Sequence, residues 1–142
     1  MFENTEHHLR ISAWREFRDS LEESETPFRD LIDKYKRSPL VSIHNDPWNQ
    51  STWPTPWQLV EENQYCDFSR VLGMCYSLQL TERFSQDQFE IHIVIDRKNS
   101  STHYLLYVGK TLIEHPNGVQ DNAKFLPEHF EIKKKYSMPK LQ

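Results

Sequence analysis

The first 38 residues carry two runs of hydrophobic residues at helical spacing. Residues three and four positions apart lie on the same face of an α-helix. Ser12 precedes the first run and can act as its N-cap, and Thr26-Pro27 supplies an N-cap and a proline at the start of the second. The pattern predicts a helical hairpin over residues 1–38. Its hydrophobic stripes are Trp14, Phe17 and Leu21 in the first helix, and Phe28, Leu31, Ile32 and Tyr35 in the second.

A loop and two further helices are predicted for residues 39–81. Ser38-Pro39 ends the second helix, and the prolines and tryptophans of residues 39–55 lie in a polar setting, which indicates an ordered loop. Thr55-Pro56-Trp57-Gln58 is a capping box with proline at the first helical position, so a short helix should cover residues 56–62. Over residues 66–81 hydrophobic side chains wrap most of the helical circumference, which is typical of a helix buried on most sides.

Alternation with a period of two then predicts an antiparallel meander. Residues 89–96 alternate hydrophobic and polar side chains, residues 104–108 form the second strand, and residues 111–114 the third. Beyond Pro116-Asn117-Gly118 the pattern weakens, so residues 116–142 are expected to be irregular, with one more short element at residues 130–136. Lys133-Lys134-Lys135 is expected to be a solvated part of that tail. These elements predict a single α+β domain over residues 1–142.

Composition narrows the class of protein. A chain of 142 residues has the size of one domain, and 13% aromatic residues allow a sizeable core. The net charge of −4 and a pI near 6.0 disfavour binding to nucleic acid or anionic lipid. No hydrophobic run is long enough to span a membrane, and residues 1–6 lack the basic start of a secretory signal, so we expect a protein made in the cytoplasm.

The two cysteines bear on cofactors and chemistry. Cys66 and Cys75 lie nine residues apart on one predicted helix, too far for a disulfide, so both thiols should be free. Without a Cys-x-x-Cys pair, and with no ligand spacing among the histidines, neither a metal nor another cofactor is predicted. The histidines without such spacing, expected at the surface, are His7, His8, His44, His115 and His129.

Cys66 stands at the predicted start of the buried helix, where unpaired backbone N–H groups and the helix dipole favour a thiolate. A thiol nucleophile needs a base within hydrogen-bond reach, and His103 at the start of the second strand could supply it. Glu114 on the third strand could orient the imidazole. His92 is a fallback base. The alternative is that Cys66 and Cys75 are small buried hydrophobic residues and that the histidines only pack.

Residues 46–115 resemble the bacterial transglutaminase-like cysteine peptidases, a branch of the papain-like fold. The resemblance rests on Thr55-Pro56, the short helix after it, Cys66-Asp67-Phe68 at a helix start, and a strand led by His103. It implies a transglutaminase-like core over residues 56–115, with Cys66 as nucleophile, His103 as base and Glu114 as the orienting residue. Such an enzyme would be a thiol-dependent peptidase or amidase.

Three departures from that family favour a degenerate, non-enzymatic copy. Gln64-Tyr65 precedes the cysteine where the family usually has Gly-Asp, Glu114 replaces an aspartate, and the hairpin is shortened. Each departure alters the geometry that thiol catalysis requires.

Three short segments, two of them rich in tryptophan and proline, are similar to segments of small proteins from tailed, marine-type bacteriophages. The similar segments are Asp46-Pro47-Trp48, residues 53–57 and Leu72-Gly73-Met74. This resemblance implies a phage structural or assembly protein, located in the phage particle or the cytoplasm of the infected bacterium. Its partners would be other phage or virion proteins, and a homo-oligomer is compatible with the sequence.

Trp48, Trp53 and Trp57 are the candidate binding residues, because exposed aromatic side chains anchor interfaces. The alternative is that they pack the loop over the central helix. A third hypothesis is a host-directed binding protein that uses Trp53 and Trp57.

Overall fold

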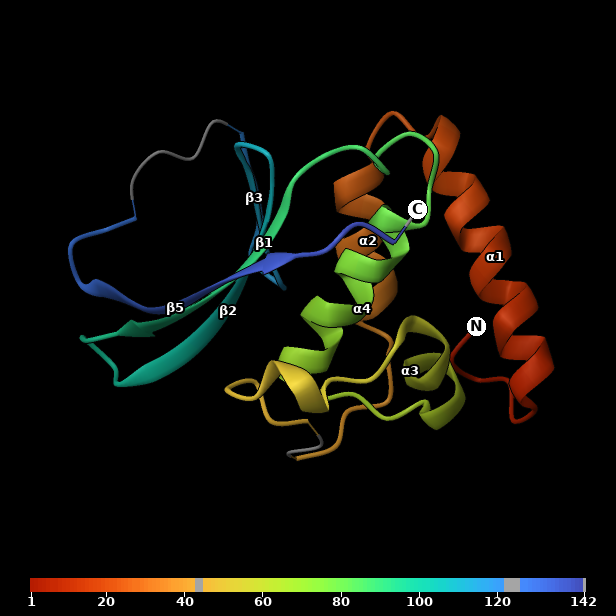
Figure 1. The fold of residues 1–142 in the computed structure, drawn as a ribbon, viewed down its shortest axis with the longest axis horizontal. Helices are drawn as coiled ribbons and strands as arrows, with labels where there is room; N and C mark the ends of the chain where they lie inside the picture. Colours follow the sequence, from red (N-terminus) through yellow and green to blue (C-terminus); the bar gives the residue numbers. More distant parts are fainter. Residues whose placement is uncertain (43–44, 122–125, 142) are drawn as a thin grey trace.

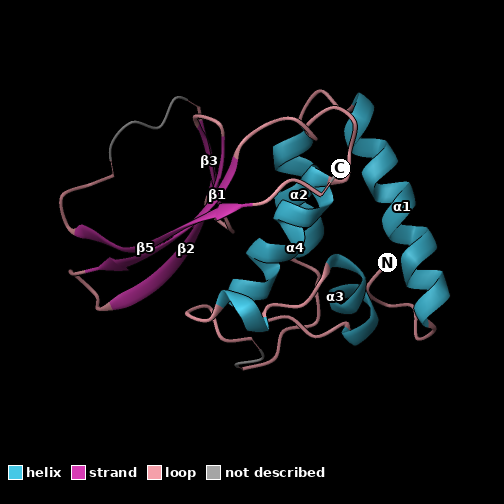
Figure 2. Cartoon of the chain, viewed as in Figure 1, coloured by secondary structure: helices cyan, strands magenta, loops and turns pink. Residues whose placement is uncertain are grey.

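The computed structural model describes residues 1–42, 45–121 and 126–141, and its elements form an α+β fold (Figure 1). Helices and sheet are separated in space: the sheet lies to one side, α4 lies between it and the helices α1 and α3 (Figure 2), and α2 contacts both α4 and β4. This confirms the predicted fold class. The elements in chain order are α1 (His7–Glu23), α2 (Pro27–Tyr35), the 3-10 turn η1 (Gln50–Thr52), α3 (Pro56–Glu62), α4 (Asp67–Gln79), β1 (Phe89–Asp96), β2 (Ser101–Val108), β3 (Thr111–Glu114), β4 (Gly118–Gln120) and β5 (Phe130–Met138).

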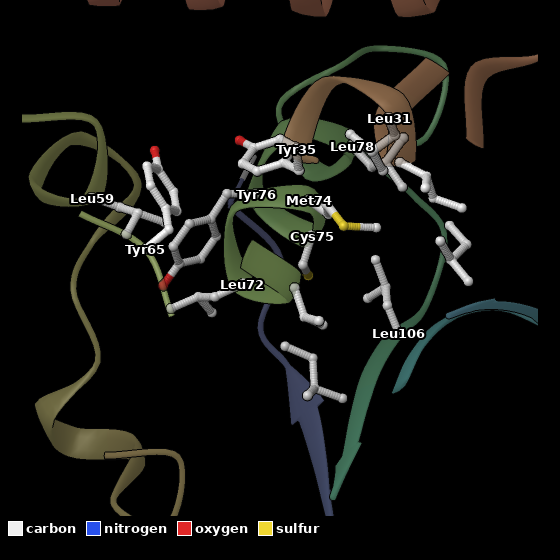
Figure 3. Close-up of a cluster of buried hydrophobic side chains, with 14 of the residues drawn as sticks. Leu31, Tyr35, Leu59, Tyr65, Leu72, Met74, Cys75, Tyr76, Leu78 and Leu106 are labelled. Carbon is white, nitrogen blue, oxygen red and sulfur yellow. The ribbon is translucent and has the colours of Figure 1, made fainter. Parts of the chain in front are cut away.

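The fold is organised around α4. Eleven of its thirteen residues are buried, which confirms the predicted helix buried on most sides. Figure 3 shows the surrounding side chains: Leu31 and Tyr35 come from α2, Leu59 from α3, and Leu106 from the sheet. The main hydrophobic core of the chain is therefore built around this one helix.

A small polar network ties α4 to the two N-terminal helices. Trp14 Nε1 donates to Ser77 Oγ at 2.9 Å, and Ser77 Oγ donates to the Gly73 carbonyl at 2.8 Å. The Tyr35 hydroxyl lies 3.0 Å from Ser77 Oγ and donates to the Gly73 carbonyl at 3.1 Å. Burial raises the pKa of Tyr35, so its hydroxyl stays protonated as a donor.

The predicted start of the first helix is wrong. α1 begins at His7, and Ser12 is an exposed residue inside it. The residue that faces the core one turn before Trp14 is Arg10, which donates to the carbonyls of Val60 and Glu61. The hydrophobic pattern does not mark this turn, because a charged residue occupies its core-facing position. The side chain of Arg10 is buried, and its guanidinium donates to backbone carbonyls far away in the sequence. The capping box at Thr55 and Gln58 and the helix it opens are confirmed.

The sheet has five antiparallel strands in the order β4-β3-β2-β1-β5. The predicted meander is confirmed for β1 to β3. The prediction of an irregular segment over residues 116–142 is wrong in part, because β4 and β5 form there. The one short element expected at residues 130–136 corresponds to β5, which pairs with β1 through eight residue pairs, with a register shift at Ile93/Val94. β5 is an edge strand with little burial, so Lys133, Lys134 and Lys135 can follow one another and no hydrophobic alternation appears.

The two faces of the sheet have different neighbours. Ile91 and Leu106 belong to the main core that includes α4, whereas Val94, Leu105 and Leu112 form a second small cluster with Phe130. Because β1 is buried on both faces, hydrophobic residues follow one another almost without interruption at its centre. Within the residues that the structure describes, no helix is both long enough and apolar enough to cross a membrane.

The close approach of Tyr35 to α4 predicts that Gly73→Ala destabilises the protein. A Cβ at residue 73 would lie 2.6 Å from Tyr35 Cε1 and 3.0 Å from the hydroxyl oxygen, so the ring must move and its hydrogen bonds weaken. We expect the free energy of unfolding to fall by about 2 kcal/mol in urea titrations. Equal or higher stability would contradict the packing described here.

Ser12→Ala is the matched control, because it also places an alanine in a helix but at an exposed position. Alanine has the higher helix propensity, so stability should rise by up to about 0.5 kcal/mol. A loss of about 1 kcal/mol would instead indicate that Ser12 is an N-cap.

Candidate functional site

A surface groove of about 710 Å³ lies at the N-terminal end of α4. Its walls come from residues 45–48 of the loop, from the first residues of α4, and from the start of β2. Trp48 forms part of one wall, Cys66 and Asp67 lie at the helix start, and Tyr104 comes from the sheet. Three segments far apart in the sequence therefore meet at this point.

Trp53 fixes the loop that forms one wall. Its ring packs on Phe68 of α4 and on Tyr136 of β5, with centroid distances of 4.9 and 4.7 Å. Its indole Nε1 donates to the Asp46 carbonyl at 2.9 Å, and Asp46 Oδ1 accepts the Trp48 backbone N–H at 2.9 Å. Trp53 therefore packs the loop against the central helix, which was the alternative to a binding role. Through Asp46 it also helps to position the backbone of Trp48.

The start of the same loop is tied to the residue before Cys66. The Val41 N–H donates to the Tyr65 carbonyl at 2.7 Å, and the Tyr65 N–H donates to the Pro39 carbonyl at 3.0 Å. Arg70 of α4 adds a hydrogen bond to Ser38 Oγ at 2.8 Å. Hydrogen bonds thus tie the start of the loop to Tyr65 and Arg70, and ring packing ties Trp53 to Phe68 of α4.

The three candidate tryptophans do not form one surface. Trp48 is 55% exposed at the groove, whereas Trp57 is 49% exposed on α3 and does not line it. The Trp57 ring packs edge-on against Trp14 of α1, at a centroid distance of 5.4 Å, with the Arg18 guanidinium nearby. Of the three, only Trp48 combines large exposure with a place on the groove.

Cys66 precedes α4 directly, as predicted, and is 6% exposed at the groove. Its backbone N–H donates to Ser69 Oγ at 2.8 Å, and its Sγ lies 3.0 Å from the same hydroxyl. Cys75, one helix face away in the core, is completely buried, and burial raises the pKa of its thiol. Both cysteines are free thiols, as predicted.

His103 and Glu114 are brought together, with 3.8 Å between Nδ1 and Oε1, and His103 Nε2 lies 2.9 Å from Ser101 Oγ. Their side of the sheet differs from that of Cys66. Successive residues of a strand point to opposite faces. Tyr104 points to α4, where its ring lies 5.4 Å from Phe68, and His103 points to the other face, where its ring lies 5.7 Å from Phe130.

His115 has an environment that sequence reasoning did not reveal. It lies in a second pocket of about 400 Å³, beside the groove, with Asp67 and Arg70 of α4. His115 is half-buried, and its Nε2 has no hydrogen-bond partner among the described residues. Burial lowers its pKa, and the positive charge of Arg70 adds to this effect. No spacing signal could have placed it there, because the contact depends on how the β3 end packs against α4.

The fallback base His92 lies on the face of the sheet opposite α4 and is 6% exposed. Its Nε2 lies 2.8 Å from Glu90 Oε1, and its ring packs against Tyr107 at 4.4 Å. His129 lies 3.8 Å from Asp96, and His44 falls outside the described residues. Across the described ranges, no group of three or more His, Cys, Asp or Glu residues could hold a metal ion.

Comparison with known proteins found no family model that matches the chain, and no curated protein with a similar sequence. The likenesses to transglutaminase-like peptidases and to phage proteins therefore rest on the motifs quoted above.

The environment of His92 predicts an acid-sensitive contribution to stability. Burial lowers its pKa below the ordinary 6.5, although the hydrogen bond to Glu90 opposes this. The unfolded chain then binds the proton first on acidification, so this stabilisation is complete above pH 6.5 and declines as the pH falls towards the folded-state pKa.

We expect the His92 Cε1–H signal in NMR titrations to give a pKa below 6.5, and the free energy of unfolding to decrease between pH 7 and the folded-state pKa. His92→Leu should reduce that decrease. A pKa at or above 6.5, or an unchanged pH dependence in the variant, would contradict the assignment.

Proposed function

We propose that this chain is a non-enzymatic protein-binding module that receives its partner in the groove at the N-terminal end of α4. The observation that carries the proposal is Trp48, which is 55% exposed on a wall of the groove while its loop is fixed by Trp53. Large aromatic residues are enriched among the side chains that contribute most to binding at protein interfaces. An exposed tryptophan whose backbone N–H is hydrogen-bonded to Asp46 therefore favours recognition of a protein.

The size of the groove and the contacts of its loop support this function. A volume of about 710 Å³ accommodates one or two side chains of a partner segment. Hydrogen bonds hold the start of the loop, and ring packing holds Trp53, which reduces the conformational entropy that these segments lose when a partner binds.

The biological setting is part of the same proposal. The likeness of Asp46-Pro47-Trp48 and residues 53–57 to small phage proteins supports an assembly role, with other phage or virion proteins as partners. A cysteine at the start of a helix packed on an antiparallel sheet supports the view that the domain is a degenerate transglutaminase-like copy. The host-directed variant would use Trp48 as its anchor, since Trp53 packs internally.

A thiol peptidase or amidase is the second candidate, favoured by the place of Cys66 on the groove at the start of a thirteen-residue helix. In that reaction the Cys66 thiolate would attack an amide carbonyl, and a histidine would take the thiol proton and return it to the leaving amine. The pair His103–Glu114 points to the opposite face of the sheet, so its geometry supports binding better than catalysis.

Alkylation by iodoacetamide separates the two functions, using Cys75→Ser so that Cys66 is the one remaining thiol. The binding function predicts slow alkylation that weakens about tenfold for each pH unit below 8, as for an unactivated thiol. The urea-unfolded chain serves as the reference. Fast alkylation that persists well below pH 7 would support the hydrolase and contradict the binding function.

Panning a random peptide library on the folded protein tests the binding function itself. We expect selected peptides to shift the NMR signals of the Trp48 indole and of the Asp67 and Thr102 amides, because these residues line the groove. The Trp14 indole, buried and bonded to Ser77, is the internal control and should not shift. The function is contradicted if no peptide shifts the groove signals.

A further inference from the structure

The chemistry of the groove points to the kind of side chain it receives. Asp46 and Asp67 supply two carboxylates and Asn45 an amide oxygen, and the described residues that line the groove include no lysine, arginine or histidine. Asp46 and Asp67 are both exposed. The charged side chains among the described residues of the groove are therefore both carboxylates, and they lie beside further hydrogen-bond acceptors.

One of these acceptors has no partner. Asn45 Oδ1 is buried and makes no hydrogen bond with the described residues. A buried polar atom without a partner costs free energy, which a donor from a ligand would recover. Asp46 Oδ1 accepts the Trp48 N–H, and its second carboxylate oxygen adds a further acceptor.

Aromatic rings form the other part of the lining, from Trp48, Phe68 and Tyr104. The face of an aromatic ring attracts a cation. Outside the groove, a ring next to this set already contacts a cation: Lys134 Nζ lies 5.5 Å from the ring centroid of Tyr136, which packs on Trp53, and Trp53 packs on Phe68. Acceptors and aromatic faces together are the surroundings that a guanidinium or ammonium group prefers.

We propose that the groove binds the cationic side chain of a basic segment in the partner protein. This inference rests on the proposed function and specifies its partner. Arginine is preferred over lysine, because a planar guanidinium with five donors can stack on Trp48 or Tyr104 while it bonds to Asp67 and Asn45. The net charge of −4 also attracts a basic segment.

The test is an NMR titration with N-acetyl-arginine amide, its lysine counterpart, and the neutral isostere N-acetyl-citrulline amide. The arginine compound should shift the Trp48 indole and Thr102 amide signals with a dissociation constant of roughly 1–10 mM, as expected for one side chain. The lysine compound should bind more weakly, and citrulline should not saturate. Equal shifts with arginine and citrulline, or no shift with either, would overturn the inference.

Two substitutions test the residues that carry the inference. Asp67→Asn should weaken binding of the arginine compound about threefold to fivefold, as expected for loss of a partly exposed ion pair. Trp48→Ala should weaken it about as much, read from the Thr102 amide. Asp87→Asn, an exposed aspartate outside the groove, is the control and should leave the affinity unchanged. Loss of affinity in the control equal to that of Asp67→Asn would indicate nonspecific attraction and overturn the inference.

Failure of the cationic preference and failure of the proposed binding function give different results in these experiments. If peptides selected by panning shift the groove signals but citrulline binds as well as arginine, the binding function stands and the cationic preference is wrong. If panning yields no peptide that shifts those signals, the binding function fails, whatever the amides show.

Discussion

The structure depends on the burial of α4 on nearly all sides. Two helices, a short third helix and the strands β1 and β2 all pack against this one element. Such burial requires close backbone approach at Gly73 and a polar network through Ser77 that leaves the Trp14 and Tyr35 donors satisfied. The helices and the strands β1 and β2 are positioned by packing on α4, and β3, β4 and β5 by pairing within the sheet.

The groove arises where this burial ends. Phe68 is covered by Trp53 and Tyr104, whereas Asp67, one residue earlier, is exposed. A helix start needs partners for its free N–H groups, and Ser69 supplies one for Cys66. The loop bends around this end instead of covering it, because Trp53 is fixed to α4 and β5 and hydrogen-bonded to the Asp46 carbonyl. A groove with an exposed Trp48 on one wall is the result.

Local signals in the sequence predicted the elements whose structure is set locally. The capping box at Thr55, the burial of α4 and the alternation in β1 are of this kind. The full length of β5 and the first turn of α1 were not predicted. An edge strand that contains lysines and a turn that buries Arg10 both depend on tertiary contacts. The same distinction between local and tertiary determinants applies to the candidate site. Cys66 was placed correctly at a helix start, but the face to which His103 points and the burial of Trp53 depend on register and packing.

The central claim is that Trp48 at the groove, rather than exposed tryptophan in general, provides binding. The most direct measurement is isothermal titration calorimetry of one selected peptide with Trp48→Ala and Trp57→Ala side by side, since the two side chains are 55% and 49% exposed. We predict that Trp48→Ala weakens binding by about 2 kcal/mol or more, as for an interface hot spot, and that Trp57→Ala leaves it unchanged. Equal losses, or a loss confined to Trp57→Ala, would contradict the claim.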